Sequence, residues 1–542
     1  MMVMDAGPDR PWFKVWPEGV PRNIDYPEVP LYGLLTSQAE KYPNGVAFSV
    51  GERHLSYGEL DTLSDWLANG LLDLGVESGD RVMLFLPNSL EFVIGYYGIL
   101  KAGPAITPAN PLYRSEDLKH QLNDSGAVAI ITDEAAYPAV RDIRGETSLR
   151  AAVLTGPTRV KGTVSLEEIL GRCPSAVPRL DIRPREDVAV IAYTGGTTGL
   201  PKGVLLTHYN LVANAIQNAA WLGWSRQDVV VGLLPFYHSW GGCTCVNSPV
   251  YSGARVVILP RYGAKELLRT IERERATVLY GAASLFAMLV SDPAIGKYDI
   301  SSLKYVKAGA MPIPAEIKER WEQLTGVSML LGYGLSEASP ETHDSPPGRV
   351  KPGSIGIPIS DTDARIVDEP TGKVELPPGE VGELIIRGPQ VMKGYLNRPE
   401  DTAEVLKDGW LYTGDLATMD EAGYFQIVDR KKETIKYKGY TIAPAEIEGV
   451  LYQHPSVKEC AVIGKPDSLA GEVPKAYVVL KDGCTSSEAE LIDFCQQRVA
   501  PYKRVREVGF IDEVPKTPVG KVLRRVLRDR ERCRDGSSQN SL

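Results

Sequence analysis

The stretch YTGGTTGLPKGV, Tyr193 to Val204, is the most informative part of the sequence. A predicted strand, residues 188–193, runs into a turn of glycines and threonines, which ends at Pro201-Lys202-Gly203. Glycines let a backbone fold closely around phosphate oxygens, so that its N–H groups converge on negative charge. Threonine hydroxyls add donors, and Lys202 either adds a positive charge or pins the loop. The predicted phosphate-binding residues are Thr194, Gly195, Gly196, Thr197, Thr198, Gly199 and Lys202.

The surrounding pattern predicts an α/β fold. From residue 30 to 340, short apolar runs alternate with helical patterns, which is typical of layered sheets with mainly parallel strands. Residues 355–428 change to short strands and turns, which indicates a β subdomain. The predicted strands are 81–86, 127–131, 151–154, 188–193, 254–259, 303–306, 364–367, 382–387 and 424–428, and the predicted helices are 60–74, 265–276 and 314–325.

A charge cluster, DRKKE at residues 429–433, marks the predicted domain boundary. The chain beyond it reads as helix, strand, strand, helix, strand, helix, which predicts a small α+β domain. We therefore expect a large N-terminal domain, residues 1–429, and a mobile C-terminal domain, residues 430–542, with a hinge near Lys432.

Composition excludes several classes of protein. The chain has 542 residues, enough for a large core, and its net charge of -9 lacks the basic footprint of a nucleic-acid binder. Seven irregularly spaced cysteines predict reduced thiols and hence a cytoplasmic protein. Neither a secretory signal nor an apolar run of roughly 18 residues is visible, so we expect no transmembrane segment.

Two further segments suit a nucleotide. In LGYGLSE, residues 331–337, Tyr333 between two glycines offers a face on which adenine could stack, with Gly309-Ala310 opposite. Glu337 is a hard oxygen ligand of the kind that magnesium prefers. In YTGDLA, residues 412–417, Asp415 follows a predicted turn and could accept both ribose hydroxyls. The alternatives are a core tyrosine, a surface glutamate and a turn-capping aspartate.

With the phosphate loop, these segments resemble the acyl-adenylate-forming superfamily, which includes acyl-CoA synthetases, coumarate-CoA ligases, luciferases and peptide-synthetase adenylation domains. Two later blocks, IVDRKKETIKYKGYTIAPAEIE (427–448) and PKTPVGKVLRR (515–525), complete the order, and the resemblance covers nearly the whole chain. It implies ATP, Mg²⁺ and coenzyme A as ligands, with Thr197 and Glu337 holding the metal. The implied adenosine contacts are Gly309, Ala310, Gly332, Tyr333, Gly334, Ser336, Asp415 and Arg430.

The resemblance also implies two conformations. Lys521 would reach the acid carboxylate and the α-phosphate during adenylation, where a positioned cation stabilises developing negative charge. A pivot at Lys432 would then withdraw Lys521 and bring Lys436 toward the AMP phosphate. Lys438 and Gly439 would line the coenzyme A path, where glycine permits close backbone approach.

The acid-binding part is expected around PFYHSWGG, residues 235–242. His238 resembles the family's gate beside the carboxylate; the alternative is a core histidine with one satisfied hydrogen bond. These positions are small or apolar, with no cation for a second carboxylate, which predicts a neutral, hydrophobic acid. The opening PWFKVWPEGVP and the run HSWGG most resemble long-chain fatty acid ligases, which favours a medium- to long-chain fatty acid. The predicted acyl-channel residues are His238, Trp240, Gly241, Gly242 and Ala308.

Other functions stay open at this point. An aryl-acid (coumarate- or benzoate-like) CoA ligase shares all these motifs, whereas the Lys438-Gly439 stretch disfavours a luciferase-type monooxygenase. No carrier domain accompanies the chain, which disfavours a peptide-synthetase module, and intact Lys521, Asp415 and Glu337 disfavour a catalytically silent relative. The expected partners are small molecules and no nucleic acid. A homodimer and peripheral membrane contact are further hypotheses.

Overall fold

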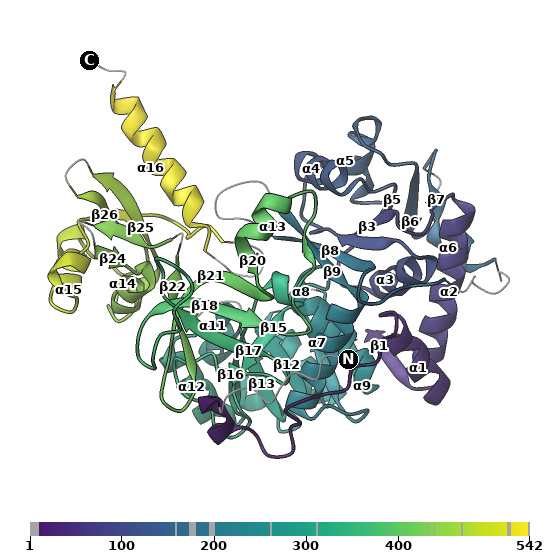
Figure 1. Cartoon of the computed structure of the whole chain (residues 1–542), viewed down its shortest axis with the longest axis horizontal. Coiled ribbons are helices and arrows are strands. Elements are labelled where there is room, and N and C mark those ends of the chain that lie inside the picture. Colours follow the sequence, from purple (N-terminus) through teal and green to yellow (C-terminus); the bar gives the residue numbers. More distant parts are fainter. Residues whose placement is uncertain are drawn as a thin grey trace.

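The computed structural model of the chain describes residues 10–157, 160–172, 180–194, 201–260, 263–309, 313–431, 433–437, 440–467, 470–516 and 522–539. In Figure 1 the N-terminal part, coloured purple to green, forms the larger body. The C-terminal part, coloured yellow-green to yellow, forms a smaller unit at one side of that body. Within the described residues the strands form sheets of nine, eight, five and five members.

The nine-stranded sheet is parallel at its centre and antiparallel at its edges. The spatial order is β16 (Ile357–Pro358), β15 (Glu341–Asp344), β14 (Met329–Gly334), β13 (Tyr305–Ala308), β12 (Val278–Gly281), β10 (Val229–Gly232), β11 (Arg255–Ile258), β1 (Val46–Val50) and β2 (Arg53–Ser56). The six central strands pair in parallel; helices connect β10, β11, β12, β13 and β14 in succession, as parallel pairing requires, and the two edges add antiparallel partners.

The eight-stranded sheet carries the predicted phosphate loop at one side. Its order is β19 (Gly394–Tyr395), β9 (Lys202–Thr207), β8 (Val188–Thr194), β4 (Ala105–Pro108), β3 (Arg81–Phe85), β5 (Ala129–Asp133), β6 (Ala151–Thr155) and β7 (Val164–Ser165). Neighbours from β8 to β7 are parallel, whereas β9 is antiparallel to both β8 and β19. One apolar core joins this sheet to the nine-stranded one.

Helices cover these two sheets, and side chains cap the first turn of several of them, among them α2 (Tyr57–Asp73), α3 (Leu90–Ala102), α6 (Leu166–Leu170) and α7 (His208–Leu222). The Ser56 hydroxyl accepts from the Glu59 N–H while the Glu59 carboxylate accepts from the Ser56 N–H, which fixes the start of the second helix. The helices of the body are α1 (Gly33–Lys41), α2 (Tyr57–Asp73), α3 (Leu90–Ala102), α4 (Ser115–Ser125), α5 (Tyr137–Arg141), α6 (Leu166–Leu170), α7 (His208–Leu222), α8 (Ser239–Gly241), α9 (Ser248–Ser252), α10 (Ala264–Glu274), α11 (Ala283–Ser291), α12 (Ala315–Thr325) and α13 (Pro399–Val405), with short helical turns η1 (Pro11–Val15), η2 (Arg144–Glu146), η3 (Gly242–Asn247), η4 (Ile295–Lys297) and η5 (Ser336–Ala338).

A five-stranded antiparallel sheet forms the predicted β subdomain. Its strands are β17 (Asp363–Val367), β18 (Gly382–Arg387), β21 (Trp410–Met419) and β20 (Leu406–Lys407), with β22 (Phe425–Arg430) paired to β21. β22 leads directly into the charge cluster, so this sheet is the last element before the C-terminal unit.

The C-terminal unit has a sheet and an apolar core of its own. Its buried residues include Ile435, Ile447, Val462, Val478 and Leu491. The elements are β23 (Ile435–Tyr437), β24 (Tyr440–Ile442), α14 (Pro444–Leu451), β25 (Val457–Asp467), β26 (Gly471–Leu480), α15 (Glu488–Gln496), η6 (Pro501–Lys503), β27 (Glu507–Phe510) and α16 (Arg524–Gln539).

The fold confirms the predicted α/β body, β subdomain and small α+β unit. Every predicted strand and helix is present, with ends shifted by at most three residues. One prediction was wrong: a β-hairpin, β23–β24, precedes the first helix of the C-terminal unit, because two strands of three residues are too short to show a period. The boundary at residue 430 stays a prediction, as does the hinge at Lys432, which lies outside the described residues.

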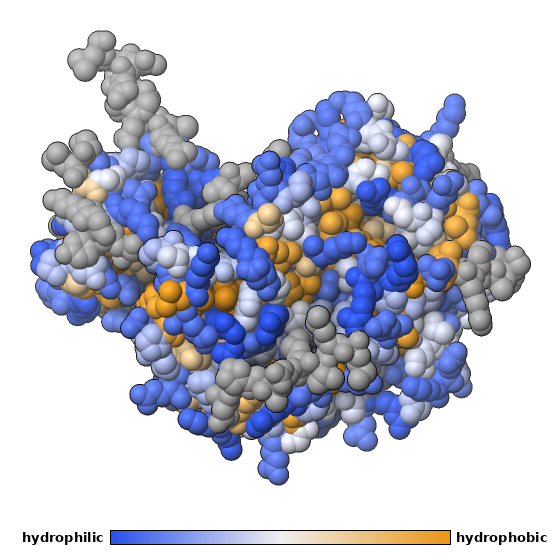
Figure 2. Space-filling model, viewed as in Figure 1, coloured by the Kyte–Doolittle hydropathy of each residue, from blue (hydrophilic) through white to orange (hydrophobic). Residues whose placement is uncertain are grey.

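In the parts of the chain that the structure describes, each helix is too short or too polar to cross a membrane. On the face drawn in Figure 2, hydrophobic residues form separate patches within a mainly hydrophilic surface. Five cysteines in the described residues, Cys243, Cys245, Cys460, Cys484 and Cys495, are free thiols.

Candidate active site

The hairpin β8–β9 holds the two ends of the predicted phosphate loop together. Thr194 at the end of β8 is paired with Lys202 at the start of β9. Residues 195–200 connect these strands, so the predicted contacts Gly195, Gly196, Thr197, Thr198 and Gly199 lie outside the described residues. The described ends fix where the loop must start and finish.

Lys202, the first residue of β9 after the loop, is held in place by contacts with two other segments. Its Nζ lies 3.0 Å from the Asp401 Oδ2 of α13 and 5.2 Å from the centre of the Tyr395 ring. Of the two roles considered for Lys202, the described contacts support the structural one, because its charge is already paired with a carboxylate.

Tyr395 connects Glu337 to the same hairpin. Its hydroxyl donates to the Glu337 Oε1 over 2.8 Å, and its strand, β19, pairs with Val204 and Leu205 of β9. The Met392 N–H donates to the Glu337 carbonyl oxygen over 2.8 Å. Burial and the neighbouring Glu337 raise the pKa of Tyr395, which keeps the phenol protonated as a donor. The predicted metal carboxylate is therefore held at a fixed place beside β9, the strand that follows the phosphate loop in the sequence.

Tyr333, Asp415 and Arg430 form one polar group. The Tyr333 hydroxyl donates to the Asp415 Oδ2 over 2.6 Å, and the Arg430 Nε lies 3.1 Å from the Asp415 Oδ1. Asp415 raises the pKa of Arg430 and keeps it charged. A carboxylate accepts at about four positions, so Asp415 retains capacity for ribose hydroxyls. The structure corrects one detail, since Asp415 lies inside β21 rather than after a turn.

The far side of Tyr333 packs against His343, with ring centres 5.8 Å apart in an edge-on arrangement. Burial lowers the pKa of His343 to about 3, so this imidazole is neutral. Tyr333 is thus held at its hydroxyl by Asp415 and at its ring by His343.

The glycines of LGYGLSE lie in close contacts with neighbouring segments. A Cβ on Gly334 would lie 2.2 Å from the Pro340 carbonyl oxygen, and a Cβ on Gly332 would lie 2.6 Å from the Lys307 Cε. A Cβ on Gly309 would lie 3.2 Å from the Trp240 ring. The backbone contact explains Gly334 without a nucleotide, whereas Gly332 and Gly309 meet side chains. Ala310 lies outside the described residues.

His238 lies beside the entrance to the phosphate loop. Its Nδ1 accepts from the Trp240 N–H over 3.2 Å, and the imidazole is half-buried rather than a core side chain. The neighbouring Ser239 hydroxyl donates to the Ser336 hydroxyl over 3.0 Å. A cavity of about 30 Å³ joins these segments and is lined by Pro108, Asn110, Tyr113, Gln121, Ala192, Tyr193, Tyr237, His238, Ser239 and Ser336.

The predicted acyl-channel residues gather around Trp240. This ring is 8% exposed, lies against Gly309 and meets Tyr280 edge-on at 6.1 Å. Ala308 is buried at the end of β13. Gly241 is required by a close backbone contact, because a Cβ there would lie 2.1 Å from the Pro235 carbonyl oxygen. Gly242 is half-buried and has no such clash.

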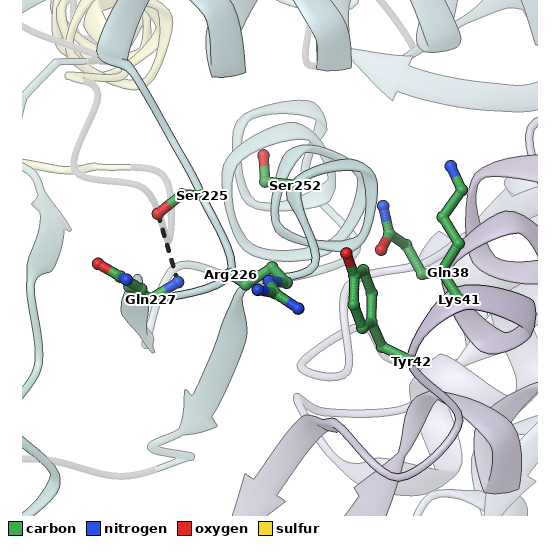
Figure 3. Close-up of a pocket in the computed structure, with 7 residues that line it drawn as sticks. All are labelled: Gln38, Lys41, Tyr42, Ser225, Arg226, Gln227 and Ser252. Atoms are coloured by element: carbon green, nitrogen blue, oxygen red, sulfur yellow. Dashed lines mark hydrogen bonds between the residues drawn. The ribbon is translucent and has the colours of Figure 1, made fainter.

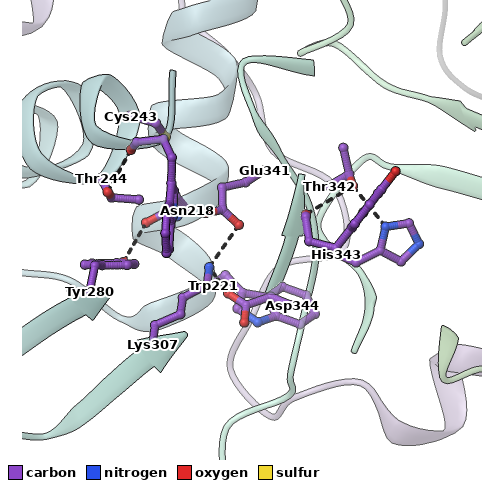
Figure 4. Close-up of polar contacts among 12 residues, drawn as sticks. Asn218, Trp221, Cys243, Thr244, Tyr280, Lys307, Glu341, Thr342, His343 and Asp344 are labelled. Atoms are coloured by element: carbon purple, nitrogen blue, oxygen red, sulfur yellow. Dashed lines mark hydrogen bonds and ion pairs between the residues drawn. The ribbon is translucent and has the colours of Figure 1, made fainter. Parts of the chain in front are cut away.

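A buried charged group behind Ala308 was missed by the sequence analysis. The Lys307 Nζ lies 2.9 Å from the Glu341 Oε2 and 2.7 Å from the Asp344 Oδ2, and all three side chains are at most 4% exposed (Figure 4). Burial opposes the charge on Lys307, but Asp344 and Glu341 outweigh it and raise its pKa. The two carboxylates already neutralise this cation.

Lys307 also braces the nucleotide side of the site. It leaves β13, passes under Gly332 of β14 and reaches the carboxylates of β15, so one side chain spans three strands. A lysine inside an apolar strand run gives no periodic signal, and only the fold reveals its partners.

A hollow of about 520 Å³ at the surface takes no part in this arrangement. It lies between the end of α1 and residues 225–227, where Arg226 stacks on the Tyr42 ring at 4.3 Å (Figure 3). None of the predicted site residues lines it.

The predicted residues of the C-terminal unit are only partly described. Lys436 is an exposed residue of β23, and its N–H donates to the Glu472 Oε2 over 2.8 Å. Lys432, Lys438, Gly439 and Lys521 lie outside the described residues. Among those described, there is no group of three or more His, Cys, Asp or Glu side chains that could hold a metal ion.

Comparison with known proteins places this site in a family. The model of the AMP-binding enzyme matches residues 35–396, and the model of its C-terminal domain matches residues 446–521. The chain belongs to the AMP-binding enzyme family. The phosphate hairpin, Glu337 and Tyr395 all fall within the first match.

Relatives match over almost the full length. A long-chain-fatty-acid–CoA ligase of Bacillus subtilis is 39% identical over 96% of this chain and 98% of its own. A 4-coumarate-CoA ligase of Narcissus pseudonarcissus is 36% identical over 88% of each chain. Among solved structures, ATP-bound MatB from Rhodopseudomonas palustris is similar with a TM-score of 0.85 and 30% identity, covering 93% of this chain and 99% of that one. The anthranilate CoA ligase AuaEII, in complex with anthranoyl-AMP, has a TM-score of 0.86 at 29% identity and covers 94% and 98%.

We predict that Lys307→Met lowers the stability of the body strongly. Removing the cation leaves Glu341 and Asp344 buried without a partner, which typically costs about 3–5 kcal/mol. The thermal midpoint should fall by several degrees in scanning calorimetry. The matched control is Lys351→Met, which removes the partner of Asp420 at a half-exposed site and should cost at most about 1 kcal/mol. Equal midpoints for the two variants would show that the Lys307 cluster does not brace the sheet.

Proposed function

We propose that the chain is an ATP-dependent acyl-CoA synthetase that activates a hydrophobic carboxylic acid, in particular a medium- to long-chain fatty acid. The observation that carries this proposal is the near-complete similarity to long-chain-fatty-acid–CoA ligases, which extends over 96% of the chain in relatives from two bacterial genera. The site geometry supports it, because the phosphate hairpin, Glu337 and the Tyr333–Asp415–Arg430 group lie on connected elements of one body.

The proposed reaction has two steps. A carboxylate oxygen of the acid attacks the α-phosphorus of ATP, and the bond to pyrophosphate breaks, which leaves an acyl-AMP. The sulfur of coenzyme A then attacks the acyl carbon, the thiol loses its proton, and the bond to AMP breaks. In the first step Lys521 balances the negative charge on the reacting oxygens. In the second, Lys436 approaches the AMP phosphate, while Lys438 and Gly439 line the path of the thiol.

Magnesium is proposed to accompany the triphosphate. Glu337 fits this role because a hard carboxylate oxygen stands beside the loop, while Thr197 is the second proposed ligand. Mg²⁺ is usually bound through one or two carboxylates together with substrate phosphates rather than by a cage of protein ligands. The ion would neutralise phosphate charge there.

The remaining assignments are also proposals. Free thiols in the described residues support a reducing compartment, for which we propose the cytoplasm. A homodimer and peripheral contact with a membrane stay hypotheses. The second candidate substrate is an aryl acid, because coumarate and anthranilate ligases are among the relatives and Trp240 and Tyr280 are aromatic.

The first test is a product assay over acids from short fatty to aromatic. We expect AMP and pyrophosphate to form with coenzyme A, with the highest kcat/KM for a fatty acid of medium or long chain. Pyrophosphate release that needs ATP and acid but not coenzyme A would identify the separate first step. Formation of ADP would contradict the proposal, and an aromatic optimum would select the second candidate.

The two half-reactions should depend on different residues. We predict that Lys521→Ala slows adenylation about 10²- to 10³-fold, because one cation is lost where charge develops, but largely spares transfer from supplied acyl-AMP. Gly439→Leu should slow transfer and spare adenylation. Pyrophosphate exchange and consumption of acyl-AMP measure the two steps, and slowing of the same step by both variants would contradict the two-conformation account.

Trp240 should limit the length or bulk of the acid. We predict that Trp240→Ala moves the optimum toward longer or bulkier acids by at least about 10-fold in relative kcat/KM, with Trp240→Phe between the two. The measurement is kcat/KM over the same acid series. An unchanged order of preference in both variants would remove Trp240 from the acyl channel.

A further inference from the structure

The segment that carries Lys521 is closed at its base by a short stem. An antiparallel bridge pairs Lys516 with Val522, and the Leu523 N–H donates to the Pro515 carbonyl oxygen over 2.8 Å. Residues 517–521 themselves lie outside the described residues, but both ends of the segment are fixed to each other. A displacement of these paired residues would therefore displace both ends of the segment together.

Arg524 follows this stem directly and is held by two carboxylates. Its Nη1 forms an ion pair with Glu433, and its Nη2 lies 2.7 Å from the Glu448 Oε2 and 2.8 Å from the Glu448 Oε1. The side chains are 12% exposed for Arg524, 3% for Glu433 and 12% for Glu448. A buried guanidinium with several charge-assisted hydrogen bonds is a rigid connector, because its planar fork fixes direction as well as distance.

The two carboxylates belong to different segments. Glu433 lies in the turn after β22, where its N–H donates to the Arg430 carbonyl oxygen over 2.9 Å. Glu448 lies on α14, and its Oε1 also accepts from the Val462 N–H of β25 over 2.7 Å. Arg524 thus ties the stem of the 517–521 loop to the linker turn and to the core of the C-terminal unit.

A separate bond crosses the linker at the same place. The Asp429 Oδ2 of β22 accepts from the Ala445 N–H at the start of α14 over 3.0 Å, and the Asp429 side chain is buried. Asp429 precedes the proposed hinge at Lys432, whereas Ala445 follows it. A pivot there would break this bond but leave the Arg524 contacts intact, because Glu433, Glu448 and Arg524 all follow the hinge.

We propose that Arg524 is a positioning residue for adenylation, which couples the loop of Lys521 to the linker so that loop and linker move as one unit. The inference rests on the proposed function. In it, Arg524 touches no substrate; it fixes the base of the loop, and the loop delivers Lys521. The coupling matters for the first step, in which Lys521 takes part, and not for the transfer step, from which Lys521 is withdrawn.

The test must separate positioning from stability. Arg524→Met alone would leave Glu433 and Glu448 buried without a cation, and such a variant can fail simply by unfolding. The triple variant Arg524→Met/Glu433→Gln/Glu448→Gln removes the whole charged group together. Arg524→Lys keeps the positive charge but loses the planar guanidinium group that binds two carboxylates in fixed directions. Arg530→Met, at an exposed arginine of the same helix, is the matched control.

Pyrophosphate exchange and transfer from supplied acyl-AMP are measured on the full-length variants, together with thermal midpoints. We expect the triple variant to lose about 10- to 100-fold in adenylation and less than about threefold in transfer, since a displacement of about 1 Å costs that much in a positioned reaction. Arg524→Lys should lie between the triple variant and the wild type, and Arg530→Met should match the wild type.

Two results would contradict the inference. Equal losses in both half-reactions would assign Arg524 a purely structural role, and unchanged adenylation in the triple variant would show that no coupling is needed. Failure of the proposed function gives a different result, namely no acid-dependent exchange in the wild type with any acid. Exchange that is unaffected by Lys521→Ala would remove the lysine assignment and, with it, the role of Arg524.

Discussion

Tyr395 lies between two charges on which the candidate site depends. Lys202 stands over its ring and Glu337 accepts from its hydroxyl, while its strand pairs with β9. The exit of the phosphate loop and the proposed metal carboxylate are therefore fixed to each other through one aromatic side chain. Because the pKa of this phenol is raised, the donor is present at any physiological pH. A catalytic group needs such fixed spacing, since most of its effect comes from preorganisation.

Three cations of the body that lie near the candidate site are paired with carboxylates of the chain. Lys307 is neutralised by Glu341 and Asp344, Lys202 by Asp401 and Arg430 by Asp415. The same pattern holds at the linker, where Arg524 meets Glu433 and Glu448. Pairing of this kind holds strands and segments together. The cation proposed for the reaction itself, Lys521, comes from the C-terminal unit, so the proposal links the chemistry to movement of that unit.

The sequence predicted the architecture well because its signals are local. Parallel strands in this chain are continuous apolar runs, and α2 and α12 show the helical period, so their positions could be read directly. The strands β23 and β24 were missed because three residues cannot display a period. The motifs likewise indicated Glu337, Asp415 and Tyr333 as site residues, although their roles stay predictions.

Contacts between residues far apart in the sequence could not be predicted from such local patterns. Tyr395 lies 58 residues from Glu337, Lys307 lies 34 and 37 residues from its partners, and Arg524 lies 91 residues from Glu433. No periodicity encodes such separations. The close approach of the Pro235 carbonyl oxygen, which requires glycine at position 241, could not be read from the sequence either. These residues become visible only when the fold brings their partners together.

The most direct measurement of the central claim is a structure of the protein with Mg²⁺ and ATP bound. The account predicts the triphosphate against residues 194–199, the adenine beside Tyr333 and the ribose hydroxyls at Asp415. A triphosphate bound elsewhere, with Tyr395 still joining Glu337 to β9 and no phosphate at the hairpin, would contradict it.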